Sequence, residues 1–101
     1  MDQVLYHATR SDWVEFVLTN GLKPNGPDNA PQRILLFLDE QDARALAATV
    51  FGVTPNDACI LAVNPLEVKL ATAEAQDGPI GRHVFAVNDI PPRALALCDN
   101  S

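Results

Sequence analysis

Basic side chains are scarce in this sequence. It has seven lysines and arginines against thirteen aspartates and glutamates, so its formal net charge is −6 at neutral pH. Non-specific binding to nucleic acid comes mostly from lysine and arginine contacts with the phosphate backbone. The charge balance therefore argues against a protein that coats DNA or RNA, although it leaves room for a local basic pocket.

Cysteines are few, and long apolar runs are missing. Cys59 and Cys98 allow one disulfide at most, which favours two free buried thiols in a reducing cytoplasm over a secreted disulfide scaffold. No apolar run comes near the roughly 20 residues that a helix needs to span a bilayer. The opening residues Met1-Asp2-Gln3 lack the basic-then-apolar pattern of a secretion signal. We therefore expect a cytoplasmic protein that does not associate with membranes.

Metal-ligand patterns and the common catalytic motifs are also missing. The histidines are His7 and His83, and neither they nor the two cysteines are spaced as zinc ligands. There is no glycine-rich phosphate loop and no G-x-S-x-G turn, and no local spacing favours a Ser/His/Asp or Cys/His triad. We expect no metal site.

The composition is that of a small globular protein. The 101 residues are 48% hydrophobic and 20% charged, which is typical of a folded chain. A chain of this length buries only about 60–65% of its unfolded surface, so its core must be packed efficiently. We predict a single domain over residues 1–101.

The first quarter of the chain predicts a strand followed by a helix. Residues 3–8 form a short apolar strand, Ser11 is the expected N-cap of the helix, and Gly21 is its expected end. Helical spacing predicts that the helix packs on the strand at residues 33–38 through Trp13, Val14, Phe16, Val17 and Leu18.

A second strand and helix follow a proline-rich loop at residues 23–32. Residues 33–38 are an unbroken apolar run that should be a central strand. Asp39 is the expected N-cap of a helix that ends at Gly52. The apolar face of that helix is expected to hold Ala43, Leu46, Ala47 and Val50.

The second half of the chain predicts strands at residues 58–63, 66–71, 82–87 and 94–97, with a turn at residues 77–79. Helices early and strands late indicate an α+β fold, with helices flanking a mixed sheet.

Short motifs follow one another through nearly the whole chain. Tyr6-His7-Ala8-Thr9 ends the first strand, Gly21-Leu22 ends the first helix, RILLFLD fills residues 33–39, Ala43 follows, and VFAVNDIPP fills residues 84–92. In this order they resemble the ADP-ribosyltransferase superfamily, most closely its RNA 2′-phosphotransferase branch. The DNA-targeting ADP-ribosyltransferase toxins share much of the same order. The resemblance implies a compact α+β fold with a split mixed or antiparallel sheet, two flanking helices, and NAD as ligand.

The resemblance also implies roles for individual residues. His7 would end its strand facing a cleft shared with Arg33 or Phe37 and would hydrogen-bond the nicotinamide ribose, while the Ala8 backbone would hold the nicotinamide amide. The implied cofactor-binding residues are Tyr6, His7, Ala8, Thr9, Phe37 and Asp39, and the implied catalytic residues are His7, Arg33, Arg82 and His83. From local setting alone Thr9 is a turn or cap residue, Phe37 a core residue and Asp39 a helix cap; for Asp39 we favour the cap.

One expected residue is missing from the late strand. Many ADP-ribosyltransferases have a glutamate there, whereas this chain has His83 preceded by Arg82. Glu67, Glu74 and Asp77 come earlier and would need a loop to carry them to the site. Three interpretations stay open: phosphotransferase-like chemistry by basic residues, a carboxylate supplied from elsewhere, or a domain that binds NAD without turning it over.

The leading hypothesis is an NAD-dependent transferase. It would move ADP-ribose, or an acceptor phosphate by ADP-ribosylation chemistry, to or from an unknown protein or nucleic-acid acceptor. Arg33 and Arg82, with Arg10, would hold a pyrophosphate or an acceptor phosphate. The rivals are a degenerate transferase fold that binds NAD or a protein partner, and a small antitoxin-like interaction protein.

Overall fold

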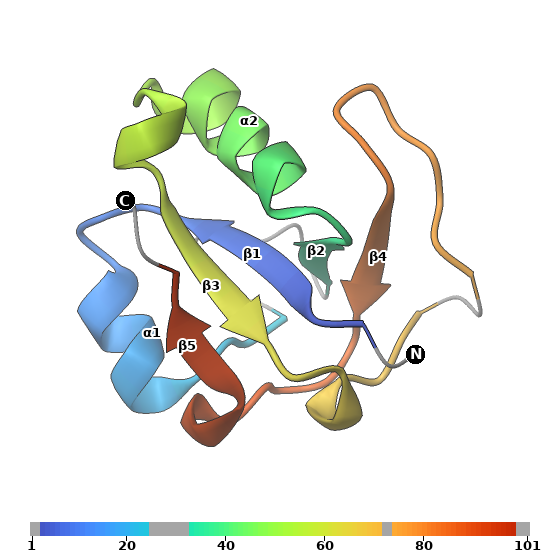
Figure 1. Cartoon of the computed structure of the whole chain (residues 1–101). Coiled ribbons are helices and arrows are strands. Elements are labelled where there is room, and N and C mark those ends of the chain that lie inside the picture. The colour runs from blue at the N-terminus through green and yellow to red at the C-terminus, as the bar shows by residue number, and fades with distance from the viewer. Residues whose placement is uncertain (1–2, 25–32, 72–73, 99–101) are drawn as a thin grey trace.

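An antiparallel sheet of five strands forms the middle of the molecule (Figure 1). The structure is a computed structural model, and it describes residues 3–24, 33–71 and 74–98. The strands lie in the order β4-β2-β1-β3-β5. Their bounds are β1 (Leu5–Thr9), β2 (Ile34–Phe37), β3 (Cys59–Val63), β4 (His83–Ala86) and β5 (Leu95–Leu97), and the helices are α1 (Val14–Asn20) and α2 (Glu40–Phe51). The α+β class is confirmed, and because the four strand pairs are all antiparallel, the sheet is not mixed.

The two helices cover opposite faces of the sheet and so divide the core into two layers (Figure 1). On one face Val17 of α1 packs with strand residues such as Leu36 and Val63. On the other face Ala43 and Ala47 of α2 pack with a second set of strand residues. This division follows from the alternation of side chains along each strand. Within the described segments, neither helix has the length and apolarity required to cross a bilayer.

Helix α1 begins later than the sequence predicts. It starts at Val14 rather than after Ser11, and no side chain caps it. Its buried side is therefore formed by Val14, Val17 and Leu18, at i, i+3 and i+4. Phe16 falls on the opposite side and is 53% exposed, so the prediction that it packs in the core is wrong. Trp13 is half-buried and meets the edge of Phe16, with ring centroids 5.6 Å apart.

Helix α2 has the predicted caps. The Asp39 carboxylate accepts from the Gln41 backbone N–H at 2.8 Å, and Gly52 ends the helix at φ 70°, in the left-handed region. Ala43 is fully buried as expected. Val50 is 60% exposed, contrary to prediction, because it faces a cavity rather than the core.

The strand predicted at residues 66–71 is not formed. The chain makes a 3₁₀ turn at Pro65–Glu67, where the Asn64 side chain accepts from the Leu66 N–H at 3.0 Å, and only Leu70 pairs with the sheet, opposite Ala86. Short polar side chains that bond the backbone compete with strand ladders in this way. The strands predicted at residues 58–63, 82–87 and 94–97 are present with slightly shorter bounds.

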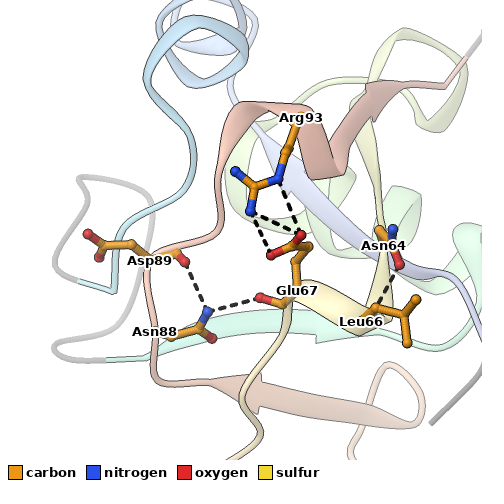
Figure 2. A network of polar contacts seen from close by, with 6 residues as sticks. All are labelled: Asn64, Leu66, Glu67, Asn88, Asp89 and Arg93. Carbon is orange, nitrogen blue, oxygen red and sulfur yellow. Dashed lines mark hydrogen bonds and ion pairs between the residues drawn. The ribbon is translucent and has the colours of Figure 1, made fainter.

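Asn88 holds this segment against the chain that leads to β5 (Figure 2). Its side-chain amide donates to the carbonyls of Glu67 and Asp89, each at 2.9 Å, and accepts from the Lys69 N–H at 2.7 Å. The Glu67 carboxylate pairs with Arg93 at 3.1 Å. Most of the predicted loop, residues 25–32, and residues 72–73 lie outside the described residues.

The burial of α1 predicts which substitution damages the fold. Val17→Ala removes two buried methyl groups and should lower the free energy of unfolding by about 2 kcal/mol. Phe16→Ala removes a half-exposed ring and should cost under about 1 kcal/mol. Urea melts of both variants measure the difference, with Asp12→Ala, which breaks an exposed ion pair, as a control of under about 1 kcal/mol. A larger loss for Phe16→Ala than for Val17→Ala would contradict the observed helix register.

Two glycines at helix ends give a second prediction. Both have positive φ, +85° at Gly21 and +70° at Gly52. A Cβ at Gly52 would meet no atom within 4 Å, so Gly52→Ala should cost only the left-handed backbone penalty, about 1–2 kcal/mol. A Cβ at Gly21 would lie 2.3 Å from the Ile90 carbonyl oxygen, which is bonded to Leu22. Gly21→Ala should therefore cost at least about 2 kcal/mol more in the same urea assay, and equal losses would contradict this packing.

Candidate functional site

His7 lies where β1 and β2 separate. β1 is paired with β3 at five positions but with β2 only where Tyr6 faces Phe37. Beyond that point the His7 side chain bonds β2 in place of the β1 backbone, since its Nδ1 donates to the Leu35 carbonyl at 2.9 Å. A carbonyl oxygen only accepts, so Nδ1 carries the hydrogen and Nε2 is the acceptor atom of the neutral ring. His7 is 3% exposed and lies in the middle of β1, not at its end as predicted.

A cavity opens beside His7, between the sheet and α2. Its volume is about 220 Å³. A neighbouring cavity of about 180 Å³ shares three of its wall residues, Leu35, Leu46 and Phe85. We call the two together the apolar trough. Its other wall residues are His7, Ala8, Phe37, Val50, Phe51, His83 and the turn Gly78–Gly81.

An aromatic corner closes one end of the trough. The His83 ring meets Phe85 edge-on at a centroid distance of 5.3 Å and Phe37 at 6.2 Å. The Arg33 guanidinium lies 5.1 Å from the centroid of the Phe85 ring, within cation–π range. The pairing of β2 with β4, which sets Phe37 opposite His83 and Leu35 opposite Phe85, creates this corner.

The turn beside this corner depends on two glycines. The His83 Nδ1 donates to the Gly81 carbonyl at 3.2 Å. A Cβ at Gly78 would lie 2.8 Å from the His83 ring, and a Cβ at Gly81 would lie 2.0 Å from the Asp42 carboxylate. The turn can therefore lie close to both side chains only because it has no side chains of its own at these positions.

The trough brings together about half of the residues that the sequence assigned to the site. His7, Ala8, Phe37 and His83 line it, and Arg33 stacks at its rim. The sequence reasoning missed Phe85, Leu46 and the glycine turn. Phe85 could have been predicted from the sequence, because the alternation of side chains along residues 82–87 places it on the same face as His83.

The remaining assigned residues lie elsewhere. Asp39 caps α2, and Thr9 lines a different cavity. Arg82 is exposed and pairs with Asp77 at 3.4 Å. Tyr6 is half-buried near Cys98. Burial raises the pKa of its hydroxyl most, and Cys98, Glu40 and Asp39 raise it further.

Carboxylates are missing from the wall of the trough, among the residues that the structure describes. Glu67 is held by Arg93, and Asp77 pairs with Arg82 in an exposed position. Glu74 is exposed. Asp42, which the sequence reasoning did not consider, has the carboxylate that packs on the trough's turn, at Gly81. None of Glu67, Glu74 and Asp77, the three carboxylates that the sequence offered as alternatives, lines the trough.

Two free cysteines lie outside the trough's wall, and both are half-buried. Burial raises the pKa of the Cys98 thiol, and the nearby Glu40 carboxylate raises it further, while the Arg44 guanidinium lowers it. Arg44 is itself buried and is paired with Glu40 at 2.7 Å. A thiol with a raised pKa forms less thiolate at neutral pH than an ordinary cysteine does.

Comparison with known proteins gives no match to any family model and no curated protein of significant similarity. These two comparisons therefore assign no function to this chain. The function has to be inferred from the trough and from the order of the motifs.

The environment of Cys98 predicts slow, pH-dependent alkylation. In a Cys59→Ser background, iodoacetamide should modify Cys98 more slowly than a reference peptide thiol at pH 8, with a rate that still rises at pH values where the peptide has reached its plateau. Glu40→Gln should move this rise to lower pH, because it removes a group that raises the thiol pKa and leaves Arg44, which lowers it. Circular dichroism checks that the variant stays folded. Alkylation of Cys98 at the peptide's rate would contradict the burial of the thiol.

Proposed function

We propose that this protein binds NAD in the apolar trough, with the nicotinamide riboside at His7, and transfers ADP-ribose to an acceptor. The observation that supports this most directly is the separation of β1 from β2 at His7, with a cavity at that point. It agrees with the resemblance, which implies a split sheet and a histidine at the nicotinamide ribose.

The walls of the trough fit a flat aromatic ring better than a phosphate. Leu35, Leu46 and Phe85 form an apolar surface, and Ala8 is small enough for a ligand to approach the β1 backbone. The two cavities together are within the size range of small-molecule pockets, about 300–1,000 Å³. The trough therefore fits the nicotinamide riboside half of NAD.

Bound NAD would supply the leaving group, since nicotinamide departs with the electron pair of the ribose C1″–N bond while the acceptor's nucleophile bonds to C1″ and releases its proton to solvent. Nε2 of His7 is buried in this structure, so a ribose hydroxyl would reach it only after the wall of the trough shifts; Nε2 would then accept the hydrogen bond while Nδ1 stays bonded to Leu35. Arg33, stacked on Phe85, would place a guanidinium beside the pyrophosphate. The apolar walls would exclude water, which competes with the acceptor.

The basic residues at the trough favour phosphotransferase-like chemistry over the glutamate-assisted kind. His83 lines the trough and Arg33 lies at its rim, whereas the wall has no described carboxylate. The same observation supports the alternative, a degenerate fold that binds NAD as a module without turning it over. In either case we place the protein in the cytoplasm, where NAD is available.

Two substitutions of His7 test the ligand assignment. In His7→Asn the side-chain amide occupies the position of Nδ1 and can still donate to Leu35, but no atom occupies the position of Nε2. In His7→Gln the longer side chain brings its amide to the position of Nε2. His7→Asn, which keeps the hydrogen bond to Leu35, should fold, and circular dichroism checks that His7→Gln folds as well. His7→Asn should weaken NAD binding about fivefold to tenfold, the effect of one lost hydrogen bond, whereas His7→Gln should retain part of it. Thermal-shift titration with NAD measures both.

The controls separate the proposal from its alternative. Asp89→Asn, which removes a carboxylate paired with Lys23 away from the trough, should leave the NAD-induced shift unchanged. Nicotinamide release measured by chromatography distinguishes a transferase from a binding module. If wild-type protein shows no NAD-induced shift at millimolar NAD, neither version holds.

A further inference from the structure

The two outer edges of the sheet are covered unequally. At one edge, β4 is bonded by the chain that precedes it, since Phe85 accepts from Ala71 and His83 pairs with Gln76. At the other edge lies β5, to whose outer side no other part of the described chain adds a strand. An uncovered edge strand presents backbone donors and acceptors to which another strand can bind. The sheet can therefore be extended at β5.

The direction of the backbone groups along β5 follows from its hydrogen bonds to β3. Cys98 donates to the Ile60 carbonyl at 2.8 Å, and the Ala94 carbonyl accepts from Asn64 at 2.9 Å. In an antiparallel pair, residues whose N–H and C=O groups face the partner strand alternate with residues whose groups face away. Residues 94, 96 and 98 therefore face β3, and residues 95 and 97 face outward.

The two outward-facing residues of β5 differ in what they can still bind. The Leu95 N–H is already bonded to the Pro92 carbonyl. The N–H and C=O groups of Leu97 make no hydrogen bond to any residue that the structure describes, and its side chain is 50% exposed. Leu97 is thus the position at which a new strand can exchange both backbone hydrogen bonds with β5.

A single exchange of this kind fits a second copy of the same strand. About a twofold axis, Leu97 faces its own counterpart, and the two residues form one antiparallel hydrogen-bonded pair. A longer foreign strand would also require the Leu95 N–H, which Pro92 holds. The axis is perpendicular to the sheet, so α1 and its counterpart lie on the same face of the extended sheet.

Helix α1 supplies contact area that the strand alone does not offer. A standard interface buries about 800 Å² of each partner, which is more than a strand of three residues presents. α1 lies beside β5 (Figure 1), and Leu95 packs on the same core cluster as the buried side of α1. The outer side of α1 has Phe16, which is 53% exposed, in edge contact with Trp13. Exposed aromatic side chains of this kind are enriched in protein interfaces.

The charges on this side of the molecule permit two copies to approach, although each has a net charge of −6. Residues 95–98 include no charged side chain. Arg93, which precedes them, is paired with Glu67 at 3.1 Å. It lies roughly 10 Å from the axis along the chain, so it and its counterpart are roughly 20 Å apart, beyond the Debye length of about 8 Å. On α1, Asp12 is paired with Arg10.

We propose that this protein forms a twofold-symmetric homodimer, in which β5 pairs with β5 of a second copy at Leu97 and the Trp13–Phe16 side of α1 packs on its counterpart. The sheet then continues through both chains. The apolar trough is built on β1, β2, β4 and α2, so the dimer does not depend on the proposed function.

Sedimentation of the full chain at increasing concentration tests the dimer. Half of the chains should be dimeric at about 100 μM or below, the weak end for an interface of standard size. Leu97→Lys, which sets two like charges at the axis, should weaken the dimer at least about tenfold, and Phe16→Ala at least about threefold. Val87→Lys is the control, because it adds the same charge at a residue 40% exposed beside β4, at the far edge. It should leave the dimer unchanged, and circular dichroism checks that each variant folds.

Hydrogen exchange of the Leu97 amide tests the position of the interface. Measured by NMR, this amide should exchange at least about tenfold more slowly at 1 mM protein than at about 20 μM, because pairing with the second copy protects it. A chain that stays monomeric up to about 1 mM would overturn the inference. So would a dimer that Leu97→Lys does not weaken, a dimer that Phe16→Ala leaves unchanged, or a dimer whose Leu97 amide exchanges as fast as that of the monomer.

Discussion

The hydrogen bond from His7 to the Leu35 carbonyl is the contact on which the site depends. At this point β1 leaves β2, and a strand that loses its partner exposes backbone groups that need new ones. The imidazole supplies one donor and stays buried while it does so. The sheet can therefore open at its centre without losing the pairing of β1 with β3 on one side and of β2 with β4 on the other.

This opening explains why α2 has so small a buried face. Ala43 and Ala47 let the first turns of the helix lie close to the sheet, whereas Leu46, Val50 and Phe51 stand over the gap beside His7. A helix that packs through alanine side chains buries little apolar area. The Arg44–Glu40 ion pair, whose guanidinium is buried, adds a contact of defined geometry but contributes little net free energy to folding. The trough is thus a consequence of how the core is packed.

The sequence predicted most elements because their signals are local. Asp39 and Gly52 mark the ends of α2 through backbone chemistry that neighbouring residues decide. The burial of Phe16 was predicted wrongly because α1 starts two to three residues later than Ser11 suggests, and the start of the helix decides which side Phe16 is on. The strand at Leu66 was predicted wrongly because the side chains of Asn64 and Asn88 bond the backbone there in place of strand hydrogen bonds. Asn88 is distant in the sequence, so no local pattern indicates it. The trough joins residues from β1, β2, β4 and α2, and no local pattern could specify that assembly.

The walls of the apolar trough constrain any ligand that fills it. Arg33 lies at the rim, stacked on Phe85, while His7 and apolar side chains form much of the remaining wall. A negative group is therefore favoured near Arg33, and a flat ring is favoured along the apolar wall, where it can stack on Phe85. The constraint follows from strand pairing, because the pairing of β2 with β4 places Phe37 opposite His83 and Leu35 opposite Phe85.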